Sequence, residues 1–281
     1  MNWRDVRKID AHIHILPDEK LDEILKEDPD NVMRFAKAET YISCMDKYNI
    51  SKAILVPASS PHMYYFEPEK TNAFHADLVR KYPARFISFA DVPKTAFDLM
   101  ESGALSLQDA VVNYGMKGVK IHPSNLHIPM DSLDYVPLLR RAADLNIPVM
   151  IHSNPTFSGF ADDCAPDRIN RMIKIFPDLI FITSHMGGVK WQDAMWNGYV
   201  DISGTLPFFI KEYGVEQTER ILKGFGANKL IFATDFPDAW FVHGPNIFET
   251  YFDILDQMHF SDEEIEKIAH GNIEKILKIN N

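Results

Sequence analysis

Eight short runs rich in β-branched and other apolar residues alternate, along the whole chain, with longer stretches of helical spacing. This alternation is typical of βα units around a parallel sheet. Between the runs, segments such as Tyr135–Asn146 carry apolar residues at three-to-four spacing, as an outer helix packed on a sheet would. The sequence predicts strands at Lys8–Ile15, Lys52–Ala58, Arg85–Val92, Gly118–His122, Pro148–Ser153, Leu179–His185, Tyr199–Ser203 and Leu230–Asp235.

The number of βα units predicts an α/β fold of the (β/α)8 TIM-barrel type. A doubly wound open sheet is the alternative, but it normally has a Gly-rich phosphate turn after the first strand, where this chain has Leu16-Pro17-Asp18. The 281 residues would allow two domains, yet a single barrel commonly has about 250 residues. We therefore expect one domain over residues 1–281, with helical additions at Asp18–Tyr48 and Ser261–Asn281.

Composition excludes several classes of protein. With 46% hydrophobic and 25% charged residues, the chain is an ordinary globular one, and its two cysteines are too few for a disulfide framework. The 29 Lys+Arg against 40 Asp+Glu give a net charge of −11, which disfavours nucleic acid as a partner. No apolar run is long enough to span a membrane, and the first residues do not resemble a signal peptide. A cytoplasmic location, no membrane association and a small-molecule partner are expected.

Titratable residues stand at the ends of four predicted strands. Alternation along the first strand places His12 and His14 on one face, while His152, His185 and Asp235 each close a later strand. An HxH pair alone is weak evidence, and each residue taken alone could be a core histidine or a capping aspartate. Because all strands of a parallel barrel open on the same face, the five side chains are expected to converge on one pocket.

The motifs around these residues, read together, resemble one known family. In chain order they are Asp10-Ala11-His12-Ile13-His14, Gly118-Val119-Lys120-Ile121-His122-Pro123, Pro148-Val149-Met150-Ile151-His152, His185-Met186-Gly187-Gly188, Asp201-Ile202-Ser203-Gly204 and Ala233-Thr234-Asp235-Phe236-Pro237. The chain resembles the amidohydrolase-related (amidohydrolase 2) branch of the amidohydrolase superfamily, which includes aminocarboxymuconate-semialdehyde decarboxylase-like enzymes. The resemblance extends to the closing segment, where Asn272 is expected to cap the last helix. One departure is Ala233-Thr234, where the family usually has Gly-Ser.

The resemblance implies one divalent metal ion bound by His12, His14, His152 and Asp235. Zinc is the first expectation, with manganese, iron and cobalt as alternatives. A catalytic metal keeps a position open for water or substrate. The resemblance places His185 beside that position without binding the metal, so His185 is expected to act as general acid or as electrostatic stabiliser. Asp235 is also expected to carry protons.

Lys120 raises a second possibility. Binuclear members of the superfamily use a carboxylated lysine on the fourth strand to bridge two metals. The alternative is a lysine in the barrel interior paired with Asp10 or another carboxylate. Since this branch is usually mononuclear, the sequence prediction does not include Lys120 among the ligands.

Loops after the strands offer weaker candidates for substrate binding. These are Asn154, Arg168 and Trp191, of which Arg168 would suit a carboxylated substrate through a charge-assisted pair. Each could equally be a solvated loop residue.

The first functional expectation is a metal-dependent hydrolase that uses metal-activated water on a small carbonyl- or carboxylate-bearing substrate. The alternative is a metal-dependent non-oxidative decarboxylase, a carboxy-lyase of the same branch, because the same ligands serve both reactions. A third, less favoured interpretation is a non-catalytic barrel that keeps a metal for stability. Self-association as a homodimer is also expected from the resemblance.

Overall fold

The computed structural model describes residues 1–154 and 159–279, and in it the chain divides into two compact units. Unit 1 comprises Met1–Ile54, Ala84–Phe86 and Asp201–Asn281. Unit 2 comprises Leu55–Pro83 and Ile87–Val200. The strands β2, β3 and β7 each have residues in both units.

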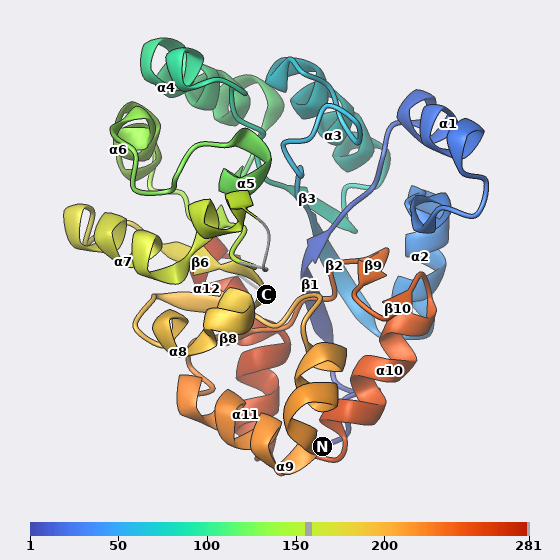
Figure 1. The fold of residues 1–281 in the computed structure, drawn as a ribbon. Helices are drawn as coiled ribbons and strands as arrows, with labels where there is room; N and C mark the ends of the chain where they lie inside the picture. The colour runs from blue at the N-terminus through green and yellow to red at the C-terminus, as the bar shows by residue number, and fades with distance from the viewer. Residues whose placement is uncertain (155–158, 280–281) are drawn as a thin grey trace. The chain divides into compact units, whose positions relative to one another are not determined.

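Unit 1 holds the first and the last elements of the chain (Figure 1). They are β1 (Lys8–Ile13), α1 (Asp18–Glu27), η1 (Val32–Phe35), α2 (Ala38–Lys47), most of β2 (Ile50–Leu55), α9 (Leu206–Phe225), β8 (Leu230–Ile231), β9 (Asp238–Ala239), β10 (Val242–His243), α10 (Asn246–Leu255), α11 (Asp262–Glu266), η5 (Lys267–Gly271) and α12 (Asn272–Leu277).

Unit 2 holds the central elements. They are α3 (Pro68–Lys81), most of β3 (Phe86–Ser88), α4 (Ala96–Tyr114), β4 (Val119–Ile121), α5 (Pro123–Leu126), η2 (Leu133–Tyr135), α6 (Val136–Asp144), β5 (Val149–Ile151), η3 (Gly159–Cys164), α7 (Pro166–Ile175), β6 (Phe181–Thr183), η4 (Ser184–Lys190), α8 (Trp191–Ala194) and most of β7 (Tyr199–Asp201).

The eight strands predicted from the sequence are all present, and within each unit they pair in parallel. In unit 2, β4 pairs with β5, β5 pairs with β6, and β6 pairs with Tyr199 and Val200 of β7, all in parallel. In unit 1, the amide of Ala11 in β1 donates to the carbonyl of Phe232 at 3.1 Å, and Ile13 forms a parallel bridge with Phe236. Every residue of β1 is buried, as expected for a parallel strand covered on both faces. The short antiparallel pair β9–β10 was not predicted.

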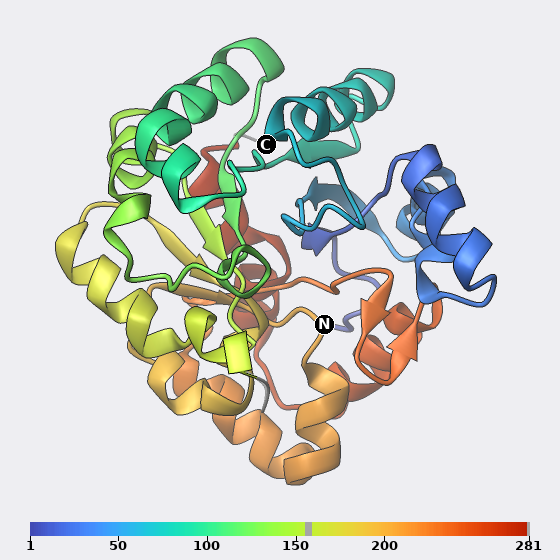
Figure 2. The same ribbon diagram turned by 45° about the horizontal axis from the view of Figure 1, so that its top comes forward.

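Helix α4 shows how the sequence builds the outer layer of unit 2. Thr95 caps its start by accepting a hydrogen bond from the Asp98 amide at 3.0 Å, and Gly115 ends it in the left-handed conformation. Its buried residues recur every three or four positions and face α6 and the strands; they are Leu99, Gly103, Leu107 and Ala110. Figure 1 and Figure 2 show α4 and α6 side by side.

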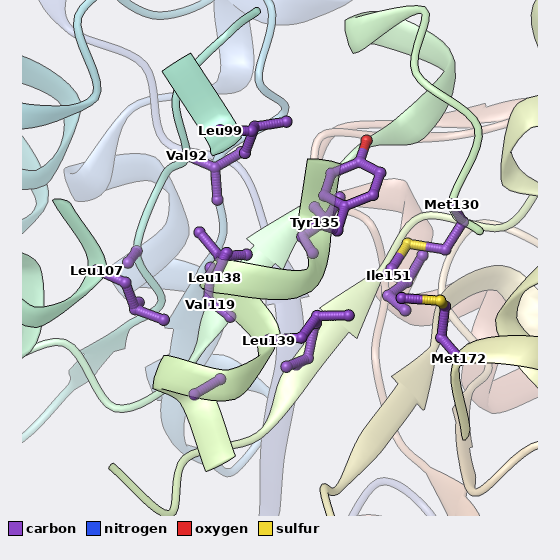
Figure 3. Packing of buried hydrophobic residues seen from close by; sticks show 14 of the residues in the cluster. Val92, Leu99, Leu107, Val119, Met130, Tyr135, Leu138, Leu139, Ile151 and Met172 are labelled. Carbon is purple, nitrogen blue, oxygen red and sulfur yellow. The ribbon is translucent and has the colours of Figure 1, made fainter. Parts of the chain in front are cut away.

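The hydrophobic core of unit 2 lies between these helices and the strands (Figure 3). Leu138 and Leu139 of α6 are completely buried, together with Val119 of β4 and Ile151 of β5. Each such side chain contributes about 1.5–3 kcal/mol relative to an exposed one. This packed layer holds β4, β5 and β6 in place, and with them the residues that follow their ends.

The expected role of Asn272 as a helix cap is wrong. Asn272 is the first residue of α12 itself, because a π-helical turn that ends at Gly271 runs directly into this helix. No side chain caps the start of α12. The Asn272 amide group instead donates to the carbonyls of Ala227 and Leu230, both at 2.7 Å. It therefore ties the last helix to the start of β8.

Among residues 1–154 and 159–279, no helix combines the length and the apolar character that crossing a membrane requires.

Candidate metal centre

Three of the predicted metal ligands meet in unit 1, where β1 lies beside the segment after β8. The Nε2 atom of His12 and the Nε2 atom of His14 both lie 3.3 Å from Oδ1 of Asp235. Backbone hydrogen bonds fix this register: the Asp235 amide donates to the His12 carbonyl at 2.9 Å, and the His14 amide donates to the Phe236 carbonyl at 2.8 Å. Asp235 itself has a φ of 65°, a rare value that turns its side chain at this point.

The spacing of these atoms fits a divalent cation. One ligand atom from each of His12, His14 and Asp235 lies within 4.8 Å of the others. Two donor atoms, each about 2.1 Å from one ion, lie roughly 3 to 3.4 Å apart at octahedral or tetrahedral angles. The separations of 3.3 Å fall in this range, and two imidazoles with a carboxylate form a donor set that several divalent ions accept.

Asp10 supports this arrangement from inside the strand. Its carboxylate is buried and accepts hydrogen bonds from the Tyr41 hydroxyl at 2.7 Å, the Thr234 hydroxyl at 2.6 Å and the Thr234 amide at 3.0 Å. Burial raises the pKa of Asp10 to about 7, although the hydrogen bonds from Thr234 and Tyr41 act in the opposite direction. Asp10 thus joins β1 to the segment that carries Asp235.

Asp201 is a site residue that the sequence prediction left out, although it stands in one of the quoted motifs. Its Oδ2 atom lies 3.2 Å from Nδ1 of His12, the ring nitrogen opposite the one that faces Asp235. The Ser203 amide donates to Oδ1 of Asp201 at 3.1 Å, and the Ser203 hydroxyl also contacts both Asp201 and Nδ1 of His12. A carboxylate two residues before a serine at the end of a strand is the sequence signal for this group.

The other two predicted histidines lie in unit 2 and contact each other. Nε2 of His185 lies 3.0 Å from Nδ1 of His152, and the His152 ring stacks on that of His122 with 3.7 Å between centroids. His122, at the end of β4, was not among the predicted site residues. The buried Lys120 donates to the Ser184 hydroxyl at 3.3 Å.

The backbone after β6 is unusual and explains the His-Met-Gly-Gly motif. His185 and Met186 both have positive φ, 59° and 53°, and two glycines with positive φ follow. A Cβ on Gly188 would lie 2.3 Å from Oδ1 of Asn154, so only glycine fits there. A non-glycine residue held in the left-handed region at a strand end is a feature of functional sites.

The structure separates the three weaker candidates for substrate binding. Arg168 is engaged with acidic groups of unit 2: its guanidinium donates to the carboxylate of Asp131 at 2.6 Å and to that of Asp162 at 3.3 Å. These two carboxylates, Asp131 first, raise the pKa of Arg168. Trp191 is the first residue of α8 and is half-buried. Oδ1 of Asn154 is buried and accepts no hydrogen bond from the described residues, so this side chain offers a free acceptor beside Gly188.

Comparison with known proteins gives one family match over almost the whole chain. The model of the Amidohydrolase family Amidohydro_2 matches residues 9–279. The γ-resorcylate decarboxylase of Polaromonas sp. strain JS666 is 23% identical over 260 residues, which covers 75% of this chain and 76% of that protein.

Solved structures of the same fold cover the chain from end to end. A dihydroxybenzoic acid decarboxylase from Polaromonas sp. JS666, solved with bound manganese and the inhibitor 2-nitroresorcinol, has a TM-score of 0.72 at 20% identity, over 100% of this chain and 98% of that one. An uncharacterised TIM-barrel protein from Bordetella bronchiseptica has a TM-score of 0.75 at 18% identity, over 97% and 99% of the two chains. The predicted TIM-barrel fold and the predicted family are thereby confirmed. The prediction of an enzyme of this superfamily is confirmed as well.

The first functional expectation, a hydrolase, is wrong. The relatives with named activities reported above are decarboxylases, which supports the carboxy-lyase alternative. The physical reason for the error is that a His/Asp metal site can serve either reaction, because the outcome depends on how the substrate lies at the metal. Zinc likewise gains no support, since the metal named in the relative's structure is manganese.

Proposed function

Since this chain belongs to the amidohydrolase family, we propose that it is a metal-dependent carboxy-lyase that removes carbon dioxide from a small aromatic carboxylate without an oxidant. The observation that carries the proposal is the placement of the His12 and His14 Nε2 atoms on one oxygen of Asp235. The decarboxylases among its relatives support the reaction class and suggest a hydroxybenzoate as the substrate.

The metal would be held by His12, His14 and Asp235, with His152 retained as the fourth ligand that the family resemblance implies. A divalent cation bound there supplies positive charge that orients the oxygen atoms of the substrate. Manganese is proposed as the ion, because a manganese-bound decarboxylase is among the structural relatives. Zinc is the alternative that metal analysis distinguishes.

The reaction needs one proton and no redox partner. The bond between the ring carbon and the carboxylate breaks, its electron pair stays on the ring carbon, and that carbon takes a proton as carbon dioxide leaves. His185 and Asp235 are the groups we propose for this proton, in the roles that the family resemblance implies. Asp235 is suited to exchange protons with solvent because its side chain is 21% exposed.

The test joins metal content to product analysis. The protein is purified without chelator, analysed for bound metal, and incubated with 2,6-dihydroxybenzoate and its isomers while released carbon dioxide is measured. We expect about one equivalent of metal in the wild type and in His259→Ala, whose ring is 88% exposed, and none in His12→Ala. Carbon dioxide release should follow the metal content.

Two results would contradict the proposal. A His12→Ala variant that keeps both metal and activity would remove the proposed ligands. A metal-loaded wild type that releases no carbon dioxide from any hydroxybenzoate would remove the proposed substrate class.

Domain organisation and assembly are also proposed. The family match runs without interruption through segments of both units, which supports one catalytic domain over residues 1–281. For the expected homodimer, light scattering should give a molar mass near twice the 32.2 kDa of the chain. A mass equal to one chain would contradict it.

A further inference from the structure

We propose that Asp201 is a positioning residue for His12: it holds the ring by Nδ1, so that Nε2 is presented to the metal beside Asp235. This inference rests on the proposed metal site and concerns unit 1 alone. Neither the sequence prediction nor the related proteins described above give Asp201 a role.

The geometry around the His12 ring is two-sided. One ring nitrogen, Nε2, lies 3.3 Å from Asp235, and the other, Nδ1, lies 3.2 Å from Asp201. The His12 side chain is 1% exposed and that of Asp201 is fully buried. A ring fixed at both nitrogens inside the protein has little freedom to rotate, so Asp201 sets the direction in which Nε2 points.

The chemistry of a carboxylate sets the tautomer as well as the direction. An ionised carboxylate only accepts hydrogen bonds, so the His12 nitrogen that faces Asp201 carries the hydrogen. In the neutral ring, Nε2 then keeps its lone pair, which is the form that binds a metal. A carboxylate behind a metal-binding histidine is a recurrent arrangement that orients the ring and raises its basicity.

Ser203 holds Asp201 in place in turn. Its amide donates to Oδ1 of Asp201 at 3.1 Å, and its hydroxyl donates to the same atom. Both bonds end on Oδ1, while Oδ2 is the atom that faces Nδ1 of His12. The buried carboxylate therefore has donors for both of its oxygens, as a buried charge requires.

The same geometry argues against Asp201 as a ligand of the ion that Asp235 binds. Asp201 lies on the Nδ1 side of the ring, whereas the Nε2 atoms of both His12 and His14 face Asp235. A ligand and its supporting carboxylate on opposite nitrogens are distinguishable by mutation, because loss of a support weakens binding while loss of a ligand abolishes it.

The experiment measures binding of Mn²⁺ alone, by calorimetry, to wild type, Asp201→Ala, Asp201→Asn and Asp235→Ala. We expect the dissociation constant to rise 10- to 100-fold in Asp201→Ala. Asp201→Asn, which keeps an acceptor oxygen of the same shape, should recover part of that loss. Asp235→Ala should show no measurable site. Unfolding midpoints confirm that each variant is folded, and the isosteric Asp201→Asn serves if Asp201→Ala is not.

A second readout is spectroscopic and needs no metal. In protein with ¹⁵N-labelled histidine, the His12 ring signals are assigned by their loss in His12→Gln. Wild type should show hydrogen on Nδ1, and Asp201→Ala should shift the ring toward the tautomer with hydrogen on Nε2. Ser203→Ala should cause a smaller shift in the same direction.

Each outcome decides the proposal. Unchanged Mn²⁺ affinity and unchanged ring shifts in Asp201→Ala would overturn it, because Asp201 would then be a structural residue only. Loss of the site in both Asp201 variants, with His12 ring shifts unchanged, would make Asp201 a ligand and also overturn it. If the wild type binds Mn²⁺ but releases no carbon dioxide, the proposed function fails while the role of Asp201 stands; if it binds no metal, the ring shifts still decide.

Discussion

Lys8, the first residue of β1, is buried, and its ammonium group donates hydrogen bonds to backbone carbonyls of unit 1 rather than to an acidic side chain. Its Nζ donates to the carbonyls of Trp3 at 2.7 Å and Val6 at 2.6 Å, and lies 4.9 Å from the centre of the Phe252 ring. Burial lowers the pKa of Lys8 from 10.5 to about 8, and the more distant Asp5 and Asp256 only partly offset this. The strand that carries His12 and His14 therefore begins at a titratable group.

The pH dependence of stability follows from this shift. Below pH 8 both the folded and the unfolded chain carry the proton on Lys8, so the group adds no slope. Between pH 8 and 10.5 the unfolded chain binds more protons, so the unfolding free energy rises with pH. At 1.36 kcal/mol per pKa unit, the gain at pH 9.5 relative to pH 7 is about 2 kcal/mol.

The variant Lys8→Met isolates this effect. At pH 7 it should be less stable than the wild type, because buried carbonyls lose their donor. The stability difference should then grow by about 2 kcal/mol at pH 9.5, since only the wild type gains from losing the proton. Urea unfolding followed by circular dichroism at the two pH values measures it, with the exposed Lys37→Met as the control for loss of one charge. An equal difference at both pH values would refute the reasoning and show that the carbonyls keep the ammonium protonated.

Two further predictions concern unit 2. Leu138→Ala should lower the unfolding free energy by about 2–5 kcal/mol through the cavity it leaves. The control Leu133→Ala, at a residue that is 70% exposed, should change it by less than about 0.5 kcal/mol. Equal effects of the two variants in a denaturant titration would contradict the assigned core. Asp91→Ala should lower the unfolding free energy by about 3–5 kcal/mol, because it leaves the buried ammonium of Lys94 without its carboxylate. The double variant Asp91→Ala with Lys94→Met should recover much of that loss. Additive losses in the double-mutant cycle would show that the two groups do not interact.

The sequence was sufficient for the strands but not for their ends. All eight runs form strands. The alternation of short apolar runs with stretches of helical spacing identifies strands and helices without any knowledge of how the strands pair. The run predicted as Leu179–His185 stops at Thr183, since the residues that follow take left-handed backbone angles that no apolar pattern reports. The β9–β10 pair was missed because strands of two residues leave no periodicity to detect.

The candidate site could be predicted as residue types but not as partners. His12, His14 and Asp235 were predicted from their positions at strand ends, and they do meet in unit 1. Asp201 was missed because a carboxylate at a strand end has many ordinary uses, and only the fold shows that its oxygen faces a ring nitrogen of His12. The reaction was also mispredicted, since ligands alone do not record the position of the substrate.

The three polar residues on one face of β1 have different roles, and their burial explains why. Asp10 is buried deepest and accepts hydrogen bonds from the Tyr41 hydroxyl, from the hydroxyl and amide of Thr234, and from the His12 amide. These four bonds use the acceptor positions of its two oxygens, so it has no lone pair to spare for a metal. The His12 side chain is 1% exposed, which leaves its orientation to buried neighbours rather than to solvent. His14 is 11% exposed and, like the more exposed Asp235, lies on the side that solvent reaches. A substrate or proton entering from solvent therefore meets Asp235 before Asp201, which is why we propose proton transfer for the first carboxylate and positioning for the second.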